Sequence, residues 1–133
     1  MNQHSTLPVT ETLAAFVAAL RYEQLPANVA EEAKLAIADT VGSALAAAKE
    51  SVTTAALSTV DSQGPASVWG LGRKVSARDA AFVNGTMAHA HDIDDTNPSM
   101  RGHPSAPVVP VVFALGDQLG ASGKDIIAAY IAG

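Results

Sequence analysis

Apolar residues recur at every fourth position in the segment that follows Pro26, which is the spacing of one face of an α-helix. The residues of this series are Val29, Ala33, Ile37, Val41 and Leu45. Most other positions from 36 to 48 are also small or apolar, so we expect this helix to be enclosed by others. Alanine is the most frequent residue, and only 5% of the chain is aromatic. Both features favour closely packed helices over β-sheets.

Helical spacing and capping signals predict further helices along the chain. They are expected at Thr10 to Leu25, Ser51 to Val60, Ala80 to His91, about Pro107 to Gln118, and Ile126 to Ala132. Ser67 to Trp69 is expected to be a short extended segment. Asn84-Gly85 is a hairpin signal within the third of these helices, but the apolar period on both sides favours a helix. The sequence therefore predicts an all-α fold, with about six helices in a bundle over residues 1–133.

Charge and composition exclude several classes of protein. The net charge is −5 and the eight Lys and Arg residues are scattered, so we expect no nucleic-acid partner. The chain has no cysteine, which excludes disulfides and thiolate metal sites. Residues 1–8 do not resemble a signal peptide, and no apolar stretch approaches the roughly 18 residues that a membrane helix needs. We expect a cytoplasmic protein with no membrane partner.

The last predicted helix is apolar up to the final residue, Gly133, and no capping residue or polar tail follows it. An apolar helix that ends without a cap normally continues or finds a partner. We therefore expect the 133 residues to be the N-terminal part of a longer protein.

Ionisable residues are concentrated between His89 and His103, where the sequence reads HAHDIDDTNPSMRGH. If the helix continued through this segment, His89 and Asp92 would share a face, and His91 and Asp95 would form an i, i+4 pair. A carboxylate beside an imidazole is a common arrangement for a general acid or base. Arg101, in the same segment, could hold a substrate carboxylate with two hydrogen bonds.

Each of these residues also has a purely structural interpretation. His89 can be a hydrogen-bonded structural histidine, and His91 can complement the dipole at a helix end. Asp94 and Asp95 can cap the loop, or one of them can be a buried partner of the histidines. Asn97-Pro98 can be a simple turn.

A divalent metal is an alternative occupant of this segment, because imidazole and carboxylate groups are common metal ligands. A histidine followed by aspartate, as in His91-Asp92, also occurs in helical metal-dependent phosphohydrolases. Those folds need further histidines upstream, and the chain has only His4 there. An Asp-Asp pair binds magnesium in prenyltransferases, but their second carboxylate cluster is absent. The sequence favours no metal and no cofactor.

The motif pattern of the chain resembles the MmgE/PrpD family. The resemblance rests on AAFVNGTMAHAHDIDDT at residues 80–96, on HPS at 103–105, and on the later SG and AYIAG segments, in the family's order. Family members include 2-methylcitrate dehydratase, cis-aconitate decarboxylase and iminodisuccinate epimerase, which act on small polycarboxylates without a metal or organic cofactor. Their fold is a large helical domain with a smaller lid domain. The resemblance implies that residues 1–133 are part of the helical domain, with the active-site loop at 92–104 and the lid absent.

The family resemblance also implies site residues and an activity. Asp92, Thr96 and His103 correspond to active-site residues, and we expect them to be catalytic. We also expect Arg101, His91 and Asn84 to bind substrate. The implied activity is a lyase similar to 2-methylcitrate dehydratase, working by metal-independent acid–base catalysis, in a protein that forms homodimers. The isolated chain should be inactive, because further basic residues of the family come from later segments.

Two other functions remain open from the sequence. The chain can be a non-catalytic helical oligomerisation module, with the last apolar helix as its partner surface. It can also be a metal-dependent hydrolase that binds its ion through His91 and Asp92.

Overall fold

The structure, a computed structural model, describes residues 8–133; the seven residues before them, including His4, lie outside the described part. Residues 8–133 form six α-helices, one short 3₁₀ helix and one two-stranded sheet, which confirms the all-α prediction. The elements are α1 (Val9–Ala19), η1 (Tyr22–Gln24), α2 (Ala27–Ala46), α3 (Ser51–Ser58), β1 (Ala66–Val68), β2 (Arg73–Val75), α4 (Ala77–Ala88), α5 (Ser105–Leu119) and α6 (Gly123–Ala132). None of the helices in this part combines the length and the apolar character needed to cross a bilayer.

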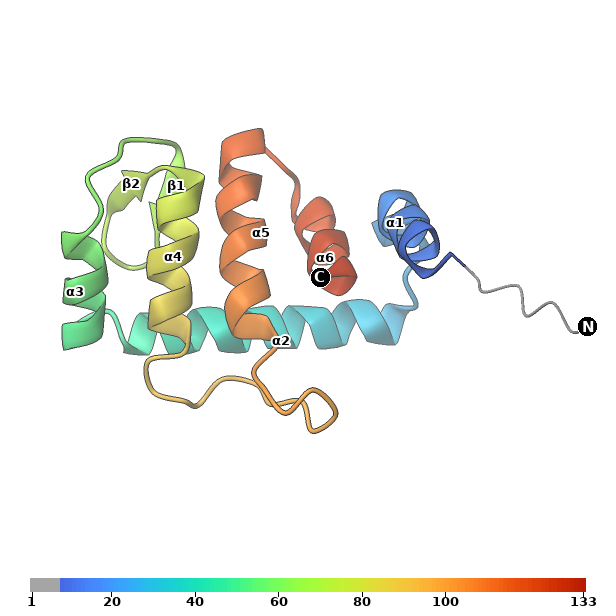
Figure 1. The fold of residues 1–133 in the computed structure, drawn as a ribbon, viewed down its shortest axis with the longest axis horizontal. Helices are drawn as coiled ribbons and strands as arrows, with labels where there is room; N and C mark the ends of the chain where they lie inside the picture. Colours follow the sequence, from blue (N-terminus) through green and yellow to red (C-terminus); the bar gives the residue numbers. More distant parts are fainter. Residues whose placement is uncertain (1–7) are drawn as a thin grey trace, which may run out of the picture.

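Helices α4 and α5 lie side by side and both cross α2, which runs along one edge of the molecule (Figure 1). Helix α3 and the sheet pack on the outer side of α4, and α6 packs on the outer side of α5. Val83 and Met87, one turn apart on α4, are fully buried together with Val109 of α5. The apolar side chains of α4 and α5 thus form the centre of the core, and the chain between these two helices emerges beside α2.

The two strands form an antiparallel hairpin in which Ala66 pairs with Val75 and Val68 with Arg73. Its turn contains Gly70 and Gly72, both with positive φ, a backbone conformation that glycine adopts at little cost. The extended segment near Ser67 was expected from the sequence, whereas the second strand was not. Three residues with no apolar alternation give no strand signal of their own.

Asn84 connects this hairpin to α4. Its side-chain Oδ1 accepts a hydrogen bond from the N–H of Trp69 at 3.0 Å, and its Nδ2 donates to the carbonyl of Ser67 at 2.9 Å. The residue is 1% exposed. The Asn84-Gly85 pair therefore lies inside a helix, as expected, and the structure gives Asn84 the task of satisfying β1 backbone groups.

The prediction that α2 is enclosed on most sides is wrong for residues 8–133. Its buried residues are Ala30, Ala33, Thr40, Ser43 and Ala44. These residues face the helices that cross α2, whereas Leu35 and Leu45 on the other sides are exposed. Packing partners lie along only one side of α2, so the helix buries one stripe of small residues.

Helix α4 ends three residues earlier than expected, at Ala88, and His89 is its C-cap. The predicted helical face with His89 and Asp92, and the i, i+4 pair of His91 and Asp95, are therefore not formed. Asp92 has a left-handed backbone, which a continued α-helix does not allow, and Asp94 and Asp95 bond to His89 and Ser105 at the two ends of the connection.

Candidate active site

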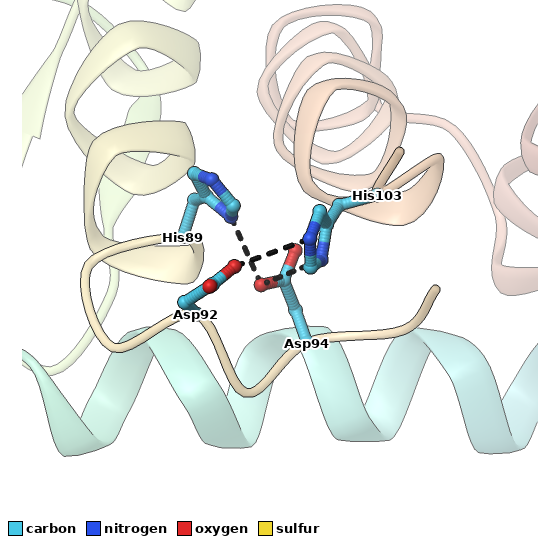
Figure 2. Close-up of side chains that lie close together, drawn as sticks. All are labelled: His89, Asp92, Asp94 and His103. Carbon is cyan, nitrogen blue, oxygen red and sulfur yellow. Dashed lines mark hydrogen bonds and ion pairs between the residues drawn. The ribbon is translucent and has the colours of Figure 1, made fainter. Parts of the chain in front are cut away.

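Four ionisable side chains converge where the connection between α4 and α5 leaves one helix and enters the other (Figure 2). They are His89, Asp92, Asp94 and His103. His89 caps α4, both aspartates lie on the connection, and His103 precedes the first turn of α5. One potential ligand atom from each residue lies within 4.8 Å of those of the others. The packing of α4 against α5 therefore fixes the distance between the two histidines.

The ring of His103 has a carboxylate oxygen beside each nitrogen. Its Nε2 lies 3.1 Å from Asp92 Oδ1, and its Nδ1 lies 3.3 Å from Asp94 Oδ1. The second contact is close but not aligned as a hydrogen bond. His89 Nδ1 forms a hydrogen bond of 3.0 Å with the same Asp94 oxygen, and the centres of the two imidazole rings are 4.6 Å apart. Asp94 therefore joins the two histidines.

Burial differs sharply between the two aspartates. The side chain of Asp94 is 0% exposed, that of His103 is 24% exposed and that of Asp92 is 74% exposed. Asp94 Oδ2 and His103 Nδ1 are buried without a hydrogen-bond partner among the described residues. Buried polar atoms without partners are uncommon in proteins and are often found at functional sites. The cluster thus has a buried carboxylate on one side and an exposed carboxylate on the other.

Asp92 has a left-handed backbone, with φ of 54°. This region is unfavourable for most residues but is tolerated by aspartate and asparagine. Strained backbone of this kind is concentrated at functional sites. The left-handed turn after α4 is what allows the side chain of Asp92 to approach His103.

A hollow of about 810 Å³ lies beside the cluster. Its wall is largely apolar and comes from α3, α4 and the start of α5, including Val52, Phe82 and Pro107. His89 and His103 also line the hollow, and they are the ionisable residues of its lining. A small molecule placed in the hollow would therefore meet the two imidazoles.

The model of the MmgE/PrpD N-terminal domain matches residues 11–133. The chain belongs to the MmgE/PrpD family. This match includes the whole cluster and every described α-helix except the first residues of α1.

Curated relatives of the chain are named as cis-aconitate decarboxylases. This chain is 30% identical to the enzyme of Aspergillus terreus, 34% identical to that of Homo sapiens and 31% identical to that of Mus musculus. Each alignment covers 94% of this chain and 27% of the relative. The chain thus spans about a quarter of the length of these family members.

The structure brings together two of the three residues expected to be catalytic. Asp92 and His103 are in contact, whereas Thr96 is exposed on the connection and is not one of the four clustered residues. Their catalytic role is a prediction that rests on the family resemblance.

The residues expected to bind substrate lie in three different places. His91 is exposed, and its Nε2 lies 3.8 Å from Glu50 Oε1. Arg101 is exposed in a turn closed by hydrogen bonds to Asn97, so Asn97-Pro98 is indeed part of a turn. Asn84 is buried against β1. The four-residue cluster contains none of these three residues.

The central position of Asp94 is not predictable from the sequence. The pattern allows Asp94 and Asp95 alike to cap the loop, or either one to be a buried partner of the histidines. The structure separates them, because Asp94 contacts His89 and His103, whereas Asp95 accepts hydrogen bonds from Ser105. In an irregular segment, no residue spacing predicts which of two adjacent carboxylates turns inward.

The cluster also has the donor set of a possible metal site, with two imidazoles and two carboxylates. The hydrolase interpretation placed an ion on His91 and Asp92, but His91 points toward Glu50 and is not in the cluster. The predicted His91-Asp92 metal pair is therefore not formed. The imidazoles and carboxylates that do come together lie 3.0–3.3 Å apart, which is within reach of direct pairing between them.

Proposed function

We propose that this chain is the N-terminal part of a lyase that acts on a small polycarboxylate by acid–base catalysis without a metal. The observation that supports this proposal is the position of His103 between two carboxylates. Family membership and the names of the relatives point to the same class of reaction.

The position of His103 provides a proton for transfer. An unprotonated ring nitrogen and a carboxylate oxygen repel each other, because both present lone pairs. A neutral imidazole carries one proton and can satisfy only one of its two carboxylate neighbours. A second proton, on the ring or on either carboxylate, would relieve the repulsion at the other nitrogen. In this proposal the half-buried His103 and the exposed Asp92 carry the transferred proton, and buried Asp94 orients the ring.

This proton can serve a decarboxylation or a dehydration. In a decarboxylation, the bond to the departing carboxylate breaks, its electron pair stays on carbon, and the proton moves to that carbon as carbon dioxide leaves. In a dehydration, the pair takes a proton from the carbon next to a carboxylate and gives one to the departing hydroxyl. Acid–base groups of this kind typically contribute a factor of about 10²–10⁴ in rate.

The names of the relatives favour cis-aconitate as the first substrate to test, and 2-methylcitrate is the second. The described lining of the hollow contains no Lys or Arg, so we propose that cations for the substrate carboxylates come from other parts of the protein. This is also why we expect residues 1–133 alone to be inactive.

The experiment is a substrate screen with the complete protein that contains this chain. Purified protein is incubated with cis-aconitate, 2-methylcitrate, citrate or iminodisuccinate, and products are identified by proton NMR. We expect conversion of one of these polycarboxylates and a loss of at least about 10²-fold in kcat for His103→Gln. Lack of conversion of all four, or full activity of His103→Gln, would contradict the proposal.

A further inference from the structure

A series of hydrogen bonds links the connection between α4 and α5 to α6. Ser105, the first residue of α5, donates its hydroxyl proton to Asp95 Oδ2 at 2.7 Å, and its backbone N–H donates to Asp95 Oδ1 at 3.1 Å. The hydroxyl oxygens of Ser105 and Tyr130 are also 2.7 Å apart. A serine hydroxyl has only one proton, and here Asp95 accepts it. Tyr130 must therefore be the donor to Ser105.

These hydrogen bonds lie beside the contact between Asp94 and His103. Asp95 follows Asp94 directly, and Ser105 lies two residues after His103. Both pairs join the same segment of the connection to the start of α5. Ser105 is 0% exposed, so its hydroxyl has no access to water if a partner is lost. A shift of Asp95 relative to Ser105 would move Asp94 relative to His103.

We propose that Tyr130, acting through Ser105 and Asp95, is a positioning residue for the His103 ring. This inference rests on the proposed function, because it assigns a role in the same site. Tyr130 lies on α6, which packs against α5 and α2, and it does not belong to the four-residue cluster. Misplacement of a catalytic group by about 1 Å can lower the reaction rate by a factor of about 10². Residues that hold a catalytic group in place therefore affect the rate even without touching the substrate.

The test uses the complete protein and the variant Tyr130→Phe, which removes a single oxygen atom. The matched control is Tyr22→Phe, because Tyr22 is the other tyrosine of the chain and lies on η1. The first readout is the NMR spectrum of labelled histidine rings, with the His103 signals assigned from His103→Gln. We expect Tyr130→Phe to shift the His103 signals and Tyr22→Phe to leave them unchanged.

The second readout is kinetic. We expect Tyr130→Phe to lower kcat about tenfold with KM changed less than twofold, and Tyr22→Phe to have neither effect. Ser105→Ala should have at least the effect of Tyr130→Phe, and the double variant should be no worse than Ser105→Ala, because both act along one path. Asp95→Asn is a second variant in case Ser105→Ala does not fold, and it should shift the same His103 signals.

The outcomes separate this inference from the proposed function. Unchanged His103 signals in folded Tyr130→Phe overturn the positioning role, even if the variant melts at a lower temperature. Absence of lyase activity in the wild-type protein overturns the proposed function, while the NMR comparison still decides the role of Tyr130.

Discussion

Removal of the Asp92 carboxylate and removal of the Asp94 carboxylate should affect activity and stability differently. Asp94 is buried between two imidazoles, so its replacement combines lost orientation with an unfavourable buried environment. Asp92 is mostly exposed and contacts only the Nε2 side of His103. A change at Asp92 therefore reports on chemistry with little effect on folding.

We expect Asp92→Asn to lower kcat about 10²-fold or more in the complete protein and to change stability by less than about 0.5 kcal/mol. Asparagine keeps the shape and tolerates the left-handed backbone, but it lacks the charge and basicity. Steady-state kinetics and thermal unfolding measure the two effects, with exposed Asp61→Asn as the control. Near-normal kcat with a raised KM would show that Asp92 binds substrate and does not take part in proton transfer.

For single residues, the sequence indicates which segment holds the site but not how its side chains are arranged. The density of histidine and aspartate between His89 and His103 indicates a site, and family resemblance selects Asp92 and His103 from it. The contact between these two residues depends on the left-handed turn at Asp92, which follows from how the helix ends. Single-residue backbone conformations of this kind leave no periodic signal.

Helices α4 and α5 make close contact at Gly85. A Cβ atom added to Gly85 would lie 3.6 Å from the carbonyl oxygen of Ala106 and 3.9 Å from Pro110, which are ordinary van der Waals distances. Pro110 has no N–H to donate to that carbonyl within α5. Gly64 has a different environment, because its Cβ would collide with the backbone of Val75.

We expect Gly85→Ala to leave the free energy of unfolding unchanged or to raise it by up to about 1 kcal/mol, because alanine has the higher helix propensity. Gly64→Ala should destabilise the protein clearly, since backbone would have to move. Denaturant unfolding of both variants measures the difference. Strong destabilisation by Gly85→Ala would show that α4 and α5 approach each other more closely than the structure indicates.

Two helix N-termini should make the stability depend on acid pH. Hydrogen bonds from Ser62 foremost, and also from Ser76 and Arg78, hold the pKa of Asp79 below its ordinary value of 3.8. Hydrogen bonds from Ser122 lower the pKa of Asp125 in the same way. The unfolded chain takes up these protons at higher pH than the folded chain does, so protonation favours unfolding.

We therefore expect the contribution of these two carboxylates to be fully present above their ordinary pKa of 3.8 and to be lost as the pH falls through the lowered values. Unfolding measured between about pH 2 and 6 should show this loss, and it should be smaller in Asp79→Asn and Asp125→Asn. An identical pH profile for the wild type and both variants would refute this expectation.

Helices were more predictable from the sequence than the structure around them. Apolar spacing and capping signals located all six helices, and in the structure Ser76 and Ser122 cap α4 and α6. The second strand, the early end of α4 and the exposed sides of α2 were not expected. Those features depend on which neighbours an element finds, which a local pattern does not contain.

At the scale of the whole molecule, apolar side chains remain exposed on the outer helices. Leu13, Phe16 and Val17 of α1 are exposed, although they form the apolar face that the sequence predicted. Exposed apolar side chains that share one helix face often mark contacts with other protein surfaces.

We expect the 133-residue chain to self-associate when produced alone, because this face has no partner within residues 8–133. Size-exclusion chromatography with light scattering measures the mass, and Phe16→Ser should shift it toward the monomer. A folded, monodisperse monomer of the unmodified chain would contradict this expectation and the oligomerisation-module interpretation together.

A second expectation for the whole protein concerns metal ions. We expect dialysis against EDTA to leave both activity and melting temperature unchanged, since imidazole and carboxylate groups of the cluster already pair with one another. Elemental analysis after dialysis against metal-free buffer is the direct measurement. Stoichiometric zinc, manganese or iron in the dialysed protein would instead assign His89, Asp92, Asp94 and His103 as ligands.

The short separation of the clustered residues along the chain has a consequence for folding kinetics. His89 and His103 lie fourteen positions apart within the single connection between α4 and α5, so their approach requires the closure of only one short loop. Contacts at such low sequence separation form early, because little chain entropy is lost before they are made. The contact of Asp94 with the two histidines should therefore form in the same step as the pairing of α4 with α5. During synthesis from the N-terminus, the acid–base group would assemble as soon as α4, the connection and α5 are free to pair.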